Sequence, residues 1–136
     1  MDSMDEEDGV GLILFPDDGD TTSPDVAWSY TGFNAFRCRL AQAEGFVLEE
    51  MRGFGGERPW SDVSTTLEPL LDRPDDGGGK LSGAECTAIL RRLEEITDEW
   101  QEQAAEPLLQ QHIKGARQLA LVLRLCIEKD VELLFL

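Results

Sequence analysis

Residues 82–100 read SGAECTAILRRLEEITDEW, and this stretch decides the class of fold. The spacing of three and four between its apolar residues predicts an α-helix with one buried face: Cys86, Ile89, Leu93, Ile96 and Trp100. The Ser82-x-x-Glu85 pattern predicts a capping box, in which hydroxyl and carboxylate each satisfy a free amide at the helix start. The apolar face of such a helix must be covered by other elements.

Further helical patterns lie on both sides of this stretch. Apolar residues recur at helical spacing from residue 31 until Gly45 ends the pattern, and a short helical turn follows over 46–51. Thr65-x-x-Glu68 predicts a second capping box and a helix through residue 71. Pro107 suits the first turn of a last helix, because its missing amide hydrogen is not needed there. The apolar face of residues 109–127 is wide, which predicts a central place in the core or, alternatively, an edge buried in a homodimer.

Two apolar runs lie near the ends of the chain. Residues 12–15, ended by Pro16, suit a buried strand, and residues 131–136 suit a terminal strand. Because the backbone groups of two such strands need partners, we expect the strands to pair. The sequence therefore predicts an α+β fold, mainly helical, with four to five helices and a small sheet that pairs the N- and C-terminal strands. The 136 residues suit a single globular domain over 10–136, after an acidic flexible tail at 1–9.

The charge is strongly acidic and uneven. The formal net charge is −16, and nine acidic residues precede Arg37, the first basic residue. Such a field repels nucleic acids and anionic membranes and attracts basic proteins. The basic residues form no stripe that would bind nucleic acid directly. The composition thus predicts a basic protein partner.

The compartment follows from two further features. The longest apolar run, residues 119–123, is too short for a membrane span, and the acidic N-terminus lacks the pattern of a signal peptide. The three cysteines are odd in number and widely spaced, which is typical of reduced, buried thiols: Cys38, Cys86 and Cys126. We expect a cytoplasmic protein.

The segment 74–85 maps in part onto a calcium-binding EF-hand loop. Asp76, Ser82 and Glu85 fall at ligand positions, but Pro74 and Gly78 occupy two others and supply no side-chain oxygen. Calcium requires six to eight oxygen ligands, so these three are weak metal candidates. The ordinary alternative, a glycine turn followed by a capping box, is favoured.

No catalytic constellation is evident. His112 is the only histidine, and it has no partner at a useful spacing for general-base or metal chemistry, so a structural histidine at a helix edge is favoured. We expect a protein that is not an enzyme and has no cofactor.

The acidic segment before the first long helix supplies the candidate binding residues. Asp17, Asp18, Asp20 and Asp25 are the expected contacts with a basic partner, and Trp28 and Tyr30 are candidate anchors, although aromatic residues near a helix start more often pack in the core. The leading hypothesis is a small inhibitor of the immunity-protein or antitoxin kind, including mimicry of nucleic acid. The alternatives are a degenerate EF-hand-like calcium-responsive domain and a small enzyme.

Several stretches together resemble a group of small acidic actinobacterial proteins. They are WSYTGFNAFR at 28–37, MRGFGG at 51–56, and the segment that runs from Leu70 to Cys86. In that group the loop is closer to Asp-Cys-Asp-Gly, whereas this chain has Asp76 followed by three glycines. The resemblance implies a bacterial, cytosolic protein and no particular activity.

Overall fold

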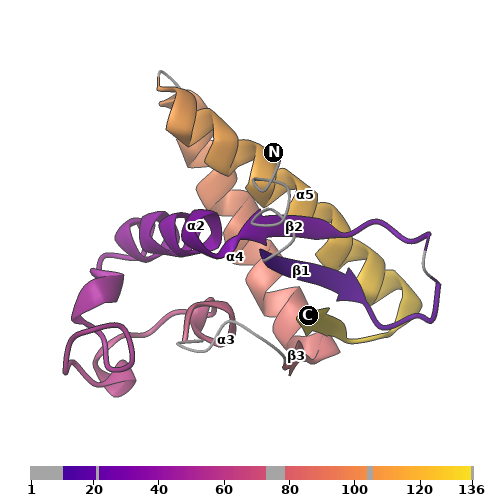
Figure 1. Ribbon diagram of the computed structural model, residues 1–136, viewed down its shortest axis with the longest axis horizontal. Helices are drawn as coiled ribbons and strands as arrows, with labels where there is room; N and C mark the ends of the chain where they lie inside the picture. Colours follow the sequence, from indigo (N-terminus) through magenta and orange to yellow (C-terminus); the bar gives the residue numbers. More distant parts are fainter. Residues whose placement is uncertain (1–10, 21, 73–78, 104–105, 136) are drawn as a thin grey trace, which may run out of the picture.

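The structure is a computed structural model that describes residues 11–20, 22–72, 79–103 and 106–135. Within these residues it contains four α-helices and a four-stranded sheet (Figure 1). The elements are β1 (Gly11–Pro16), β2 (Val26–Ser29), α2 (Tyr30–Ala43), η1 (Leu48–Glu50), η2 (Trp60–Asp62), α3 (Glu68–Leu71), β3 (Lys80–Leu81), α4 (Gly83–Glu102), α5 (Pro107–Lys129) and β4 (Leu133–Phe135). The predicted α+β, mainly helical class is confirmed.

The sheet is antiparallel throughout, in the order β2-β1-β4-β3. Leu14 lies opposite Phe135 across β1 and β4, so the predicted pairing of the N- and C-terminal strands is confirmed. Two strands, β2 and β3, were not predicted. They are four and two residues long, too short for a clear alternating pattern.

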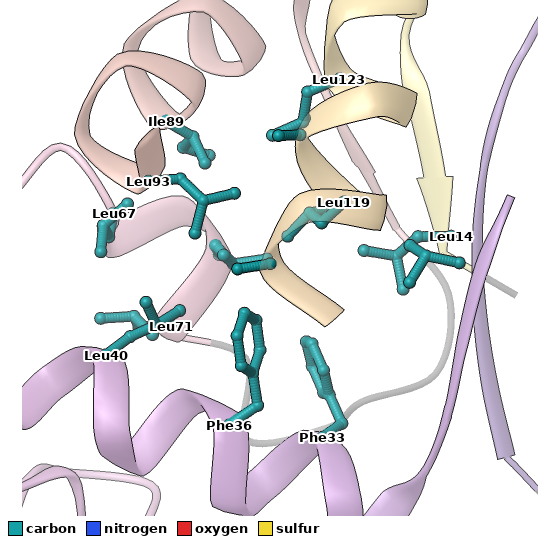
Figure 2. Close-up of a cluster of buried hydrophobic side chains, with 14 of the residues drawn as sticks. Leu14, Phe33, Phe36, Leu40, Leu67, Leu71, Ile89, Leu93, Leu119 and Leu123 are labelled. Atoms are coloured by element: carbon teal, nitrogen blue, oxygen red, sulfur yellow. The ribbon is translucent and has the colours of Figure 1, made fainter. Parts of the chain in front are cut away.

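Helix α5 occupies the centre of the domain, as its wide apolar face predicts. It packs against α4 as an antiparallel partner and lies behind β1 and β2 in the view of Figure 1. Figure 2 shows Leu119 and Leu123 of α5 between Leu14 of the sheet and the α4 residues Ile89 and Leu93. One continuous core therefore joins the sheet to both long helices.

A glycine on α5 leaves room for Trp28. A Cβ atom added at Gly115 would lie 3.1 Å from the Trp28 ring, closer than most real contacts of this kind. The indole also stacks on Phe36, with ring centroids 5.0 Å apart, and is tilted against Phe33 at 5.1 Å. Trp28 thus joins β2 to α2 and α5.

The helix ends agree with the sequence in two cases and differ in one. Ser82 and Glu85 form the predicted capping box, and Pro107 lies in the first turn of α5. The predicted capping box at Thr65 is wrong, because α3 begins only at Glu68 and has no side-chain cap. The Thr65 hydroxyl instead accepts a hydrogen bond from the amide of Leu67 at 3.0 Å and donates to a carboxylate outside the helix.

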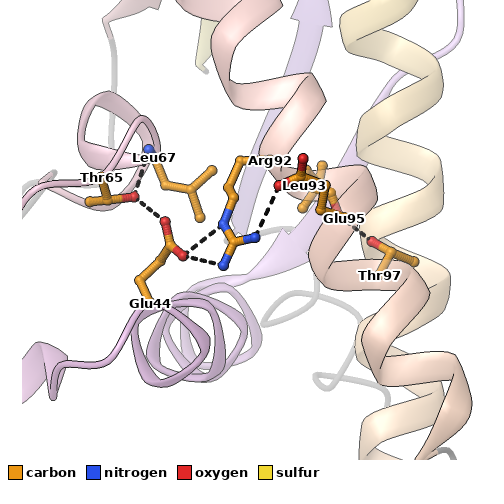
Figure 3. Close-up of polar contacts among 7 residues, drawn as sticks. All are labelled: Glu44, Thr65, Leu67, Arg92, Leu93, Glu95 and Thr97. Carbon is orange, nitrogen blue, oxygen red and sulfur yellow. Dashed lines mark hydrogen bonds and ion pairs between the residues drawn. The ribbon is translucent and has the colours of Figure 1, made fainter.

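That carboxylate belongs to Glu44, at the end of α2 (Figure 3). Its Oε1 accepts the Thr65 hydroxyl at 2.5 Å, and its Oε2 accepts Arg92 Nε at 2.8 Å and Nη2 at 2.7 Å. The Glu44 side chain is only 10% exposed. Arg92 also donates to Glu95 at 3.0 Å. This network ties the end of α2 to α4 and to the segment before α3.

Arg37 is buried, although the sequence places it away from the apolar stripe of α2. Only 2% of it is exposed. Its guanidinium lies over the ring of Phe33 at 4.7 Å and that of Phe54 at 5.2 Å, and both rings attract a cation. Phe54 comes from the glycine-rich segment 53–56, so this segment packs back against α2.

Candidate protein-binding surface

The loop between β1 and β2 is fastened to the C-terminal end of α5. The amide of Asp17 donates to the carbonyl of Glu132 at 2.8 Å. Asp18 Oδ2 accepts a hydrogen bond from Lys129 Nζ, also at 2.8 Å. These contacts join residues more than a hundred positions apart, so acidic side chains from both ends of the chain lie at one end of the sheet.

Asp18 and Asp20, two predicted contact residues, stabilise this loop from within. The Asp18 side chain is 6% exposed and also accepts hydrogen bonds from Ser23 Oγ at 2.5 Å and from the Asp20 amide at 2.9 Å. The Lys129 and Ser23 hydrogen bonds hold the pKa of Asp18 well below its usual range. Asp20 accepts from the amide and hydroxyl of Thr22, which also lower its pKa. Both carboxylates therefore stay ionised and hold the loop in place.

Four carboxylates at this end of the sheet face solvent: Asp17, Asp20, Asp25 and Asp130. None of them has an ion-pair partner among the residues that the structure describes. We call these four residues the acidic edge. Asp130 ends α5 in the left-handed conformation (φ 57°), where the negative end of the helix dipole adds to the field. The acidic edge is therefore a concentrated and preorganised negative surface.

An apolar hollow adjoins the acidic edge. Pro24, Leu121 and Leu125 line it together with Arg124 and Glu128, and its volume is about 300 Å³. Leu121 is 47% exposed, whereas most of the described leucines are buried. A partner with both basic and apolar side chains would find complementary groups here.

The two candidate aromatic anchors lie in different environments. Trp28 is half-buried and packs against Phe33 and Phe36. This is the alternative in which an aromatic residue near a helix start packs in the core. Tyr30 is 40% exposed at the start of α2, at the other end of β2 from Asp25. Only Tyr30 presents substantial ring surface to a partner, and it lies away from the acidic edge.

Two of the three weak metal candidates, Ser82 and Glu85, form the capping box of α4. The amide of Ser82 donates to Glu85 Oε1 at 2.9 Å, and the amide of Glu85 donates to Ser82 Oγ at 3.2 Å. Asp76 lies outside the described residues. Within the described part of the chain, no three His, Cys, Asp or Glu side chains are grouped as metal ligands would be.

A second hollow, between α2, η1 and the start of α5, contains His112 and Cys38. Its volume is about 330 Å³. His112 is 6% exposed, and its Nδ1 accepts a hydrogen bond from Arg39 Nε at 2.8 Å, while Arg39 Nη2 donates to Glu106 at 2.8 Å. Burial and Glu49 raise the pKa of the Cys38 thiol, so no reactive thiolate is favoured. These contacts are those of a structural histidine.

The environment of His112 predicts a pH dependence of stability. Burial, with Arg39 nearby, lowers the pKa of His112 from its ordinary 6.5, despite the opposing charge of Glu106. Just below pH 6.5 the unfolded chain therefore binds a proton that the folded chain does not, and the free energy of unfolding should fall as the pH falls. Urea unfolding of the protein and of His112→Phe across this range measures the effect. Equal slopes in the two proteins would contradict it.

Further comparisons add no family to these observations. No described helix combines the length and apolar character needed to cross a membrane. Comparisons with protein-family models, curated proteins and solved structures found no match to this chain.

Proposed function

We propose that this protein is a small acidic binding module that takes a basic protein partner at the acidic edge. The observation that carries the proposal is that solvent-facing carboxylates of the β1–β2 loop and of the end of α5 gather beside an apolar hollow. A field of this sign speeds the approach of a cationic partner, and the apolar hollow offers a place for an anchoring side chain.

An inhibitor of the immunity-protein or antitoxin kind, including one that mimics nucleic acid, is the finer form of this proposal. A protein that holds phosphate groups in a basic cleft is complementary to closely spaced carboxylates. The proposed role is not enzymatic, which agrees with the raised pKa of the Cys38 thiol and with His112 accepting from Arg39. The thiols and the charge favour the cytoplasm, and the likeness to acidic actinobacterial proteins stays a prediction.

Neutralising the acidic edge without loosening its loop tests the proposal. The variant Asp17→Asn/Asp25→Asn/Asp130→Asn removes three charges and keeps Asp18 and Asp20, which hold the loop. The probe is a dye-labelled synthetic helix of lysine and leucine, followed by fluorescence anisotropy. At roughly 0.5 kcal/mol for each exposed charge, we expect affinity to fall about ten-fold at low salt and less at high salt.

A matched variant tests whether binding depends on the acidic edge or only on the net charge of the protein. Asp98→Asn/Glu99→Gln/Glu102→Gln also removes three exposed charges, from the far end of α4. It should weaken binding much less than the acidic-edge variant. Equal losses in the two variants would mean that the peptide senses only total charge, and the proposed site would be wrong.

A further inference from the structure

The sheet has a covered face and an open face, and the open face of β1 and β4 is apolar. Along β1 the inward Leu12 and Leu14 are fully buried, whereas Ile13 between them is 38% exposed. The outward cross-strand pairs include Ile13 with Ala27 and Phe15 with Leu134, while Ser29 and Lys80 are the polar residues on this side. Figure 1 shows α5 behind these strands and no described helix in front of them.

This composition is unusual for an open face. An antiparallel sheet with one face toward water normally alternates apolar and polar residues, while strands covered on both faces carry uninterrupted apolar runs. The runs Leu-Ile-Leu-Phe in β1 and Leu-Leu-Phe in β4 are of the second kind. The strands thus have the sequence of a sheet that is covered on both faces, and the described elements cover one.

The charges around the open face indicate what covers it. None of the four strands contains an acidic residue, although the chain carries 28. At the end of the same sheet, Asp17 directly follows β1 and Asp25 directly precedes β2. A second copy of this chain would bring another charge of −16 to the contact, whereas a cationic segment would be attracted.

The dimensions suit a single helix. Ile13, Phe15 and Leu134 lie on adjacent strands about 5 Å apart, and an α-helix with its side chains is about 10 Å wide. We infer that the outer face of β1 and β4 binds the apolar side of a cationic amphipathic helix from a partner protein, whose basic residues meet the acidic edge. This inference rests on the proposed function and names the form of its partner.

Two probe peptides of identical composition test the inference apart from the proposed function. In one, the leucines lie on a single helical face, and in the other the same lysines and leucines are scrambled. The variant Ile13→Thr/Leu134→Thr keeps strand-forming residues at outward-facing positions, so the protein should still fold. Circular dichroism checks that it does. We expect this variant to bind the amphipathic peptide about ten-fold more weakly and the scrambled peptide unchanged.

A control variant shows whether a loss of binding is specific to the open face of the sheet. Leu108→Gln removes a leucine that is 48% exposed at the start of α5, outside the sheet and outside the apolar hollow, and should leave amphipathic binding nearly intact. Equal affinity for both peptides, or a loss in Leu108→Gln instead, overturns the inference while the proposed function stands. Failure of both peptides to bind overturns both.

Two other occupants of the face are tested separately: a second copy of the chain and the chain's own N-terminal segment. A dimer in sedimentation equilibrium that Ile13→Thr/Leu134→Thr dissociates would assign the face to a second copy. Tighter amphipathic binding after deletion of residues 1–9 would assign it to the chain's own N-terminal segment. Either result overturns the inference, and a monomer that binds no more tightly after the deletion supports it.

Discussion

Replacing Phe36 with alanine is expected to lower the free energy of unfolding by about 3–5 kcal/mol, the usual cost of removing a buried aromatic ring. The ring is fully buried on α2. It stacks on Trp28 at 5.0 Å and meets the edges of Trp100 at 6.3 Å and His112 at 5.9 Å. The cavity would open where β2, α2, α4 and α5 meet, so neighbouring side chains cannot easily fill it.

Urea unfolding followed by circular dichroism measures this loss. Tyr30→Ala, on the same helix, is the matched control, because it also removes an aromatic ring but from a position that is 40% exposed. Its effect should be about 0.5 kcal/mol or less, as for other surface substitutions. Similar losses in the two variants would show that the core is not centred on Phe36.

Gly56→Ala is expected to disrupt the segment between η1 and η2. A Cβ atom at Gly56 would lie 2.1 Å from the carbonyl oxygen of Glu50 and 2.5 Å from its Cα. Backbone cannot move aside as a flexible side chain can, and overpacking of this kind costs about 1–3 kcal/mol or more. Phe54 and Arg58 lie in the displaced segment, so the ring that covers Arg37 should move as well.

The control for this variant is Gly83→Ala. A Cβ atom at Gly83 meets nothing within 4 Å, and the residue begins α4, where alanine is the better helix former. Thermal unfolding should show a gain of about 0.5–1 kcal/mol for Gly83→Ala and a clear loss for Gly56→Ala. A neutral Gly56→Ala would mean that the backbones of residues 50 and 56 do not approach so closely.

Local chemistry made most of the fold predictable. Helical spacing, the Ser82 and Glu85 capping box and Pro107 act within a few residues, and the structure confirms α4 and α5 from them. The capping box expected at Thr65 did not form, because the hydroxyl accepts from the Leu67 amide and α3 begins only at Glu68. The same hydroxyl donates to Glu44, which is distant in sequence. Strands β2 and β3 depend on pairing with β1 and β4, which short segments do not reveal.

The negative charge of the candidate surface was predictable from the sequence, whereas the positions of its individual residues were less so. The sequence singled out Asp17 and Asp25, which face solvent, but also Asp18, which Lys129 holds in a contact across the whole chain. Asp130 was missed, because only the fold brings it beside the loop. The sequence does contain a signal for the outward apolar residues of β1 and β4, because apolar runs without alternation indicate a strand that is covered on both faces.

Amide chemical shifts of the protein during titration with the amphipathic lysine and leucine peptide test the central claim most directly, because they locate the bound surface residue by residue. The account predicts changes at residues 13–25 and 128–134, which diminish in Asp17→Asn/Asp25→Asn/Asp130→Asn. Changes centred on the far end of α4, or spread evenly over all exposed acidic residues, would contradict it.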